Sequence, residues 1–277
     1  MNEKEIIVSI YRHFQSIIED GRISVDMRAP SLVGTVQDDP FDCWIASEIT
    51  AALPHLEIFQ AGKLTTPDVI VRDPDSKAIV GIEVKKLLQK ASGADSRGLT
   101  MDYNSCLPCG TTLIKVGKET ISVPCFYFFA LLDPTSTGIV TLLVMDGDFL
   151  NYDFNLHKEA KLANTSEYKH GPYGEGSVRH RRMYTYPNPL NSKLPFFHLR
   201  HCLVTKKHDA EMLKLESSIT DSIIRKDIYD ESFHYSVIDF GTTPEKEIPV
   251  HEDIFKACKD RSPRDRTPSM PQIDGDK

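Results

Sequence analysis

Residues 66–86 read TPDVIVRDPDSKAIVGIEVKK, and in this stretch two runs of β-branched residues flank a strong turn signal. The DPDSK segment favours a turn, so the stretch is predicted to form a β-hairpin. A turn centred on Asp75 and Ser76 pairs residues whose numbers sum to 151, which places Val69 opposite Ile82. This register makes a specific prediction for every side chain of the hairpin.

Strand alternation gives the predicted hairpin one apolar face and one charged face. The apolar face collects Val69, Val71, Val80, Ile82 and Val84. The other face carries Asp68 opposite Glu83, with Lys85 two residues further along. Directly opposed residues have Cβ atoms about 4.5 to 5.5 Å apart, so two facing carboxylates repel unless a proton or a cation compensates. Such oxygen ligands suit Mg²⁺, and one of its bound waters is a candidate nucleophile.

The order Pro67-Asp68, followed fifteen residues later by Glu83-Val84-Lys85, resembles the motif of the PD-(D/E)XK nuclease superfamily, in particular the type II restriction endonucleases. The resemblance implies an α/β fold with a restriction-endonuclease-like mixed central sheet flanked by helices. It also implies that Asp68 and Glu83 bind the catalytic Mg²⁺. In the same way it implies that Lys85 positions or activates the attacking water and stabilises the charge that develops on the phosphorus centre.

Many members of this superfamily contribute a further Glu from an upstream helix, and Glu48 is the candidate for that metal ligand. The segment FDCWIASEITAALPH is predicted to be a helix bounded by prolines. Glu48 lies three residues after Ile45 and four before Ala52, so it is predicted to point inward with the buried stripe. Asp42 and Glu57 remain as alternatives.

The resemblance implies Mg²⁺-dependent, sequence-specific hydrolysis of phosphodiester bonds in double-stranded DNA. A palindromic site would call for a homodimer, because two-fold protein symmetry matches two-fold DNA symmetry. A restriction–modification system also implies a cognate DNA methyltransferase encoded nearby. Two alternatives stay open: another nuclease of the superfamily, acting in DNA repair or on RNA, and a non-catalytic DNA-binding or regulatory protein whose hairpin charges form a surface salt bridge.

Two polar segments are candidates for DNA contact. Asn104 and Ser105 follow the hairpin in a loop without apolar periodicity, and their side chains can hydrogen-bond to bases or phosphates. The densest basic cluster contains Arg179, Arg181 and Arg182, which suit phosphate or guanine. Four further residues are possible extensions of this basic patch: Arg200, His201, Lys206 and Lys207.

Two other motifs contain residue types that can bind metals. Cys106 and Cys109 have the spacing of half a zinc site or of a redox pair, but no second pair completes a zinc site and no βαβ start precedes them. Six cysteines in so long a chain do not form a disulfide framework, so they are interpreted as free thiols in a reducing compartment. Asp146-Gly147-Asp148 follows an apolar run and is interpreted as a turn rather than as a metal site.

Composition limits the class of protein. The chain has 277 residues and a net charge of -7, which argues against nonspecific coating of nucleic acid but allows a local basic cleft. No apolar run approaches 18 residues and no signal peptide is evident, so a cytoplasmic location is expected.

We predict a single endonuclease domain over 1–258, with a catalytic core at about 40–150. A disordered tail is predicted over 259–277. DNA-contact segments are placed at about 89–110, which is predicted to be a loop, and at about 151–207, of which 151–192 is predicted to be irregular. Two apolar runs within 121–150 are predicted strands. Besides the helix around Glu48, helices are predicted over 4–20 and 208–229.

Overall fold

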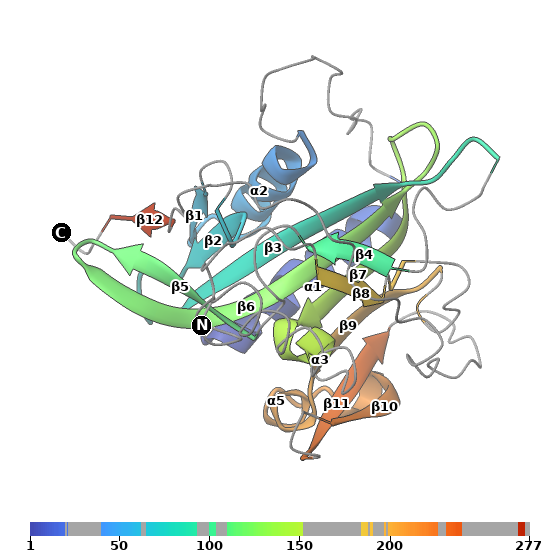
Figure 1. Ribbon diagram of the computed structural model, residues 1–277. Coiled ribbons are helices and arrows are strands. Elements are labelled where there is room, and N and C mark those ends of the chain that lie inside the picture. Colours follow the sequence, from blue (N-terminus) through green and yellow to red (C-terminus); the bar gives the residue numbers. More distant parts are fainter. Residues whose placement is uncertain are drawn as a thin grey trace.

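The computed structural model describes a mixed sheet with helices packed on it (Figure 1). The described residues are 1–19, 21, 40–61, 65–92, 100–103, 110–151, 184–187, 189–190, 197, 199–226, 231–239 and 271–274.

The predicted hairpin is formed by β2 (Val69–Arg72) and β3 (Ile79–Leu88), which pair in antiparallel orientation. Val69 lies opposite Ile82 and Val71 opposite Val80, so the register predicted from the sequence is confirmed for these pairs. The strand pairing ends at Val69, and the predicted pairing of Asp68 with Glu83 lies just beyond it. The five residues predicted for the apolar face are buried in one core cluster: Val69, Val71, Val80, Ile82 and Val84. The hairpin therefore has the two faces that strand alternation requires.

The hairpin belongs to a mixed sheet of 10 strands in the described part of the chain. The strand order is β1-β2-β3-β6-β7-β9-β11-β10, and β5 and β12 join beside β6. β3 runs parallel to β6, and β7 runs parallel to β9, whereas the other neighbours on this path are antiparallel. The remaining bounds are β1 (Glu57–Gln60), β5 (Thr111–Val116), β6 (Glu119–Leu132), β7 (Ile139–Asp146), β9 (His201–Lys206), β10 (Ile219–Lys226), β11 (Ser232–Asp239) and β12 (Gln272–Ile273). The expected mixed α/β architecture is thus present, and β6 and β7 are the two predicted strands.

Helices α1 (Glu3–Glu19) and α2 (Pro40–Ala52) cover the apolar face of the hairpin. α1 ends before Gly21, whose φ of +62° is a conformation that favours glycine, and both helices agree with the sequence prediction. The Phe14 ring of α1 meets Phe128 of β6 edge to face, with ring centroids 5.0 Å apart. No helix among the described residues is long and apolar enough to cross a membrane.

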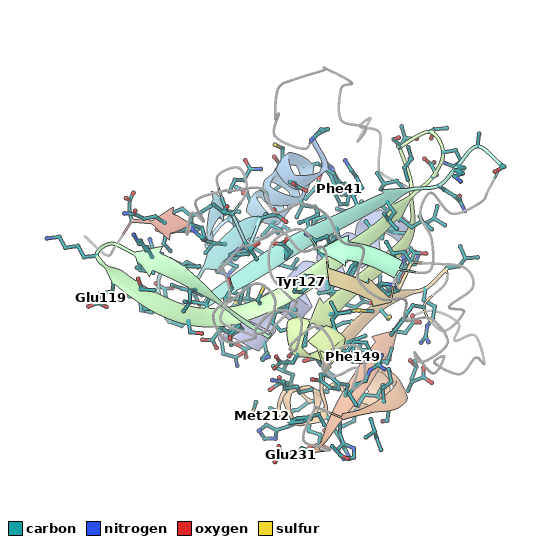
Figure 2. All side chains as sticks on the ribbon, viewed as in Figure 1. Phe41, Glu119, Tyr127, Phe149, Met212 and Glu231 are labelled. Carbon is teal, nitrogen blue, oxygen red and sulfur yellow. The ribbon has the colours of Figure 1, made fainter. Side chains whose placement is uncertain are left out.

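The opposite face of the sheet has its own aromatic core around α3 (Gly147–Asn151). Phe149 of α3 packs edge-on against Tyr235 of β11, with ring centroids 5.2 Å apart. Tyr127 of β6 belongs to the same cluster as Phe149, and both are labelled in Figure 2. Gly147 begins this short helix directly after β7, so Asp146 and Asp148 flank a strand-to-helix junction rather than a simple turn.

The helix predicted over 208–229 is wrong for most of its length. The chain forms α5 (Lys207–Met212), a 3₁₀ turn at Glu216–Ser218 and then the edge strand β10. Ile223 is 8% exposed and its neighbour Ile224 is 59% exposed, which is strand alternation. Pairing with β11 satisfies the backbone of this segment and overrides the helix-like spacing of its apolar residues.

Three segments predicted to be irregular contribute strands. β4 (Thr100–Tyr103) pairs in antiparallel orientation with β8 (Tyr184–Pro187), which joins the 89–110 and 151–207 segments (Figure 1). The expected disordered tail differs at residues 271–274, because β12 pairs with β5. The Arg72 guanidinium holds this segment by donating to the Asp274 carbonyl oxygen at 2.8 Å. Pairings between such distant segments cannot be recognised from local sequence.

A buried charge network surrounds Asp146 at the end of β7. Asp146 is 2% exposed, and its carboxylate lies 3.6 Å from Lys4 Nζ of α1. Lys4 also lies 3.0 Å from an Asp209 carboxylate oxygen, and Lys206 lies 2.7 Å from one of Asp148. Burial, followed by the negative charge of Asp148, raises the pKa of Asp146 to about 6.

We expect Asp146→Asn to stabilise the protein above pH 6, by roughly 2 kcal/mol in unfolding free energy. The folded-state pKa exceeds the unfolded value near 4, so the stability that Asp146 contributes is present below pH 4 and is lost as the pH rises through 6. The neutral amide removes this loss. Urea unfolding of both proteins at pH 4.5 and pH 7.5 measures it, and the gain should be larger at pH 7.5.

Asp133→Asn is the control of opposite sign. Burial tends to raise the pKa of Asp133, but hydrogen bonds from the Thr135 hydroxyl and the Thr137 backbone N–H hold it below its usual value. This contribution to stability is present at neutral pH and is lost on acidification, so Asp133→Asn should destabilise at pH 7.5. Equal changes in unfolding free energy from both substitutions at pH 7.5 would contradict the raised pKa of Asp146 and the lowered pKa of Asp133.

Candidate active site

The hairpin brings Asp68, Glu83 and Lys85 together on the sheet face opposite α1 and α2. The Asp68 backbone N–H donates to the Ile82 carbonyl oxygen at 3.0 Å, so Asp68 is attached to β3 just before β2 begins at Val69. The Asp68 Oδ2 atom accepts a hydrogen bond of 2.7 Å from the Val84 backbone N–H. This bond fixes the carboxylate against β3, beside the strand position that Glu83 occupies. The three residues predicted to form the site therefore lie at one place.

Glu83 is a buried carboxylate with one oxygen engaged and one left over. Its side chain is 10% exposed, and Oε1 accepts a hydrogen bond from the Lys85 ammonium. Among the described residues, Glu83 Oε2 has no hydrogen-bond partner. A buried acceptor without a partner is unfavourable by about 1 to 3 kcal/mol, more if it is charged, so such an atom calls for an explanation.

The two carboxylates are electrostatically linked. The pKa of Asp68 is raised well above its usual value, first by burial and then by the negative charge of Glu83. The Lys85 charge and the Val84 hydrogen bond act in the opposite direction but do not cancel the shift. The pair is therefore under-neutralised, and a proton or a cation between the carboxylates stabilises it.

The residues present fit a hard divalent cation such as Mg²⁺. Asp68 and Glu83 would hold it, because both supply carboxylate oxygens and Glu83 Oε2 lacks a partner in the described structure. The described residues contain no group of three or more His, Cys, Asp or Glu with the arrangement of a metal site. Mg²⁺ commonly binds through one or two carboxylates and completes its shell with water and phosphate oxygens, so two carboxylates are sufficient.

The predicted third carboxylate, Glu48, has a different neighbour. Its Oε2 atom lies 3.2 Å from His13 Nε2 of α1, and its side chain is 32% exposed. From the same helix, the negative charge of Asp42 in the first turn contributes to the raised pKa of Asp68. The structure thus pairs Glu48 with α1, and Asp42, an alternative from the sequence, is a residue of α2 whose negative charge adds to the raised pKa of Asp68.

Metal titration should separate these two carboxylates. We expect Asp42→Asn to weaken Mn²⁺ binding by roughly three- to tenfold, because it removes a negative charge that acts on Asp68. Glu48→Gln should change the affinity less than twofold, since Glu48 contacts His13. Isothermal titration calorimetry of the full chain measures both constants. A larger loss of Mn²⁺ affinity in Glu48→Gln than in Asp42→Asn would indicate that Glu48 contributes to the metal site.

Gly81 is a site-positioning residue that the sequence prediction missed. A Cβ atom at Gly81 would lie 2.8 Å from Pro67 Cγ and 3.2 Å from Thr112 Cγ2. The contact is with the residue before Asp68, so the glycine lets β3 approach the segment that presents the first carboxylate. A glycine inside a β-branched run often marks such a close approach, and this was the available signal.

We expect Gly81→Ala to lower the unfolding free energy by about 1 to 3 kcal/mol, as overpacking does in tight interiors. Moving Pro67 also displaces Asp68, so Mn²⁺ binding should weaken in the same variant. Urea unfolding and metal titration measure the two effects. Unchanged stability and unchanged binding would show that Pro67 yields without cost.

The predicted DNA-contact residues lie outside the described residues: Asn104, Ser105, Arg179, Arg181 and Arg182. Cys106 and Cys109 also lie outside them. Their proposed roles stay predictions. The described residues nearby are β4 and β8, and their pairing shows that the 89–110 and 151–207 segments contact each other.

The four residues considered as an extension of the basic patch do not form a continuous basic surface. Arg200 is 2% exposed and bonds Asp239 and Asp221, and His201 has a pKa lowered by burial. Lys206 pairs with Asp148, and Lys207 is an exposed residue that lies 3.8 Å from Glu211. Arg200 therefore stabilises the fold rather than facing a ligand.

Comparison with protein-family models, with curated proteins and with solved structures found no match to this chain. The functional proposal therefore depends on the chemistry of the site.

Proposed function

We propose that this protein is a type II restriction endonuclease, a Mg²⁺-dependent enzyme that hydrolyses phosphodiester bonds in double-stranded DNA at a specific sequence. Its proposed fold is the restriction-endonuclease-like member of the mixed α/β class. One observation supports the proposal most strongly: the Val84 N–H holds the Asp68 carboxylate beside Glu83, the Lys85 ammonium donates to Glu83, and a buried Glu83 oxygen has no hydrogen-bond partner among the described residues.

Each residue has a distinct proposed role. Asp68 and Glu83 bind the cation, with Asp68 held in place by the Val84 N–H. A bound Mg²⁺ supplies Lewis-acid chemistry, which polarises the phosphate and makes its water a better nucleophile. Lys85 orients the attacking water and places positive charge beside the developing negative charge of the phosphate. Its contact with Glu83 keeps its ammonium group at the site.

A surface salt bridge accounts less well for these residues. Lys85 carries one positive charge against the two carboxylates, and the pKa of Asp68 remains raised despite it. Glu83 is also largely buried, whereas a pair that serves only as a surface ion pair is solvated on both sides. Groups that are locally unfavourable for stability tend to be retained where they serve a function.

Double-stranded DNA is the proposed partner. The β4–β8 pairing supports this choice, because it connects the two segments that contain the polar and basic DNA-contact candidates. Recognition of a palindrome would make the active species a homodimer, and a cognate methyltransferase encoded nearby would protect the host DNA.

Digestion of phage and plasmid DNA tests the proposal. The purified chain is incubated with Mg²⁺, with Mn²⁺ or with EDTA, and the ends of any discrete fragments are sequenced. Discrete fragments that share one end sequence, formed only with metal, support the restriction enzyme. A smear indicates a nonspecific nuclease, and cleavage of RNA alone indicates an RNA nuclease of the same chemistry. No cleavage with any divalent metal contradicts a nuclease.

A further inference from the structure

We propose that Lys85 competes with a divalent cation for Glu83, so that the Lys85 ammonium must leave the carboxylate before the cation can bind tightly. This inference rests on the proposed function, because it takes Asp68 and Glu83 as the metal ligands. It adds a regulatory step to the site: the arrival of the cation releases the lysine for its role beside the phosphate.

The contacts of Lys85 include a backbone oxygen next to Glu83 as well as the Glu83 carboxylate. Its Nζ atom donates to Glu83 Oε1 and also lies 3.2 Å from the Val84 carbonyl oxygen. The side chain is 25% exposed, so the ammonium is partly removed from water. Two acceptors and partial burial hold the ammonium in one geometry more firmly than an exposed ion pair would.

A cation at Glu83 then meets a positive charge that is already in place. The oxygen that remains without a described partner, Oε2, belongs to the same carboxylate whose Oε1 binds Lys85. A cation held by Oε2 would share this carboxylate with the ammonium, and the two like charges would repel in a weakly solvated site. Either the cation binds weakly beside Lys85, or Lys85 moves away from Glu83.

The position of Lys85 on β3 allows its ammonium to stay near the reacting groups after it leaves Glu83. Lys85 extends from the same strand face as Glu83, two residues further along β3, so rotation of its long side chain keeps the ammonium near the carboxylates. A lysine released by the cation is then free to contact water or a phosphate oxygen. Cation binding and positioning of the lysine thereby become one coupled event.

Metal titration in the absence of DNA tests this competition directly. We expect Lys85→Met, which keeps the length of the side chain and removes the charge, to bind Mn²⁺ at least about fivefold more tightly than the parent protein. The same variant should lose cleavage of DNA, so binding and activity move in opposite directions. Lys85→Gln provides a second neutral side chain if Lys85→Met folds poorly.

Lys90→Met is the matched control, because Lys90 is an exposed lysine just beyond β3 and the substitution changes net charge equally. Its Mn²⁺ affinity should stay within twofold of the parent value. Equal or weaker binding by both Lys85 variants overturns the competition, as does an equal gain from Lys90→Met. If the parent protein binds no Mn²⁺ at all, the proposed metal site itself fails and the competition fails with it.

Discussion

Asp68→Asn should reduce metal-dependent DNA cleavage by at least about 10³-fold, because metal-assisted catalysis supplies several kcal/mol and each 1.4 kcal/mol is a factor of ten. The amide can still accept the hydrogen bond from the Val84 N–H, so the local backbone should be retained. Fragment formation from a plasmid under single-turnover conditions measures the loss. Full activity of Asp68→Asn would remove this residue from the mechanism.

The same substitution should leave thermal stability in EDTA unchanged or higher. The raised pKa of Asp68 means that its ionised form is disfavoured by burial and by Glu83, and a neutral amide relieves both. Loss of activity with a gain in stability is typical of a residue kept for function. Asp75→Asn is the control, since Asp75 is exposed in the hairpin turn and should keep full cleavage activity.

Arg200→Met should lower the unfolding free energy by about 3 to 5 kcal/mol, the usual cost of removing one partner of a buried ion pair. Arg200 is 2% exposed, and its Nε donates to Asp239 Oδ2 at 3.0 Å while Nη2 donates to Asp221 Oδ2 at 3.1 Å. The substitution strips Asp239, itself 6% exposed, of this charge partner. Urea unfolding at pH 7.5 measures the loss.

Two comparisons identify the cause of that loss. Adding Asp239→Asn to Arg200→Met removes the uncompensated buried charge and should recover a substantial part of the stability. Lys207→Met breaks an exposed pair with Glu211 and should cost less than about 1 kcal/mol. A loss below 1 kcal/mol in Arg200→Met would show that the network does not stabilise the sheet.

The hairpin could be predicted from sequence because its determinants are local. The turn sets the register, and alternation then decides which side chains share a face, so Val69 and Val84 are buried on the face opposite Asp68 and Glu83. Strand β10 was mistaken for a helix because Ile219, Ile223 and Ile224 recur at helical spacing, although in the strand Ile223 is buried and Ile224 is exposed. The deciding interaction is its pairing with β11.

The contribution of α2 to the site depended on tertiary packing that local sequence does not specify. The apolar stripe of α2 indicates which side of the helix is buried, but not how the helix is placed along the sheet. In the structure, Glu48 reaches His13 of α1, and Asp42 in the first turn is a residue whose charge acts on Asp68. The β4–β8 pairing was equally hidden, since its strands lie far apart in the chain.

Crystals soaked in Mn²⁺ test the central claim most directly, by an anomalous-difference map that locates the ion. We expect one strong peak between the Asp68 and Glu83 carboxylates, with the Lys85 ammonium displaced from Glu83, and loss of that peak in Asp68→Asn. A peak at another site, or no peak between these carboxylates at saturating Mn²⁺, would contradict a metal-dependent active site on this hairpin.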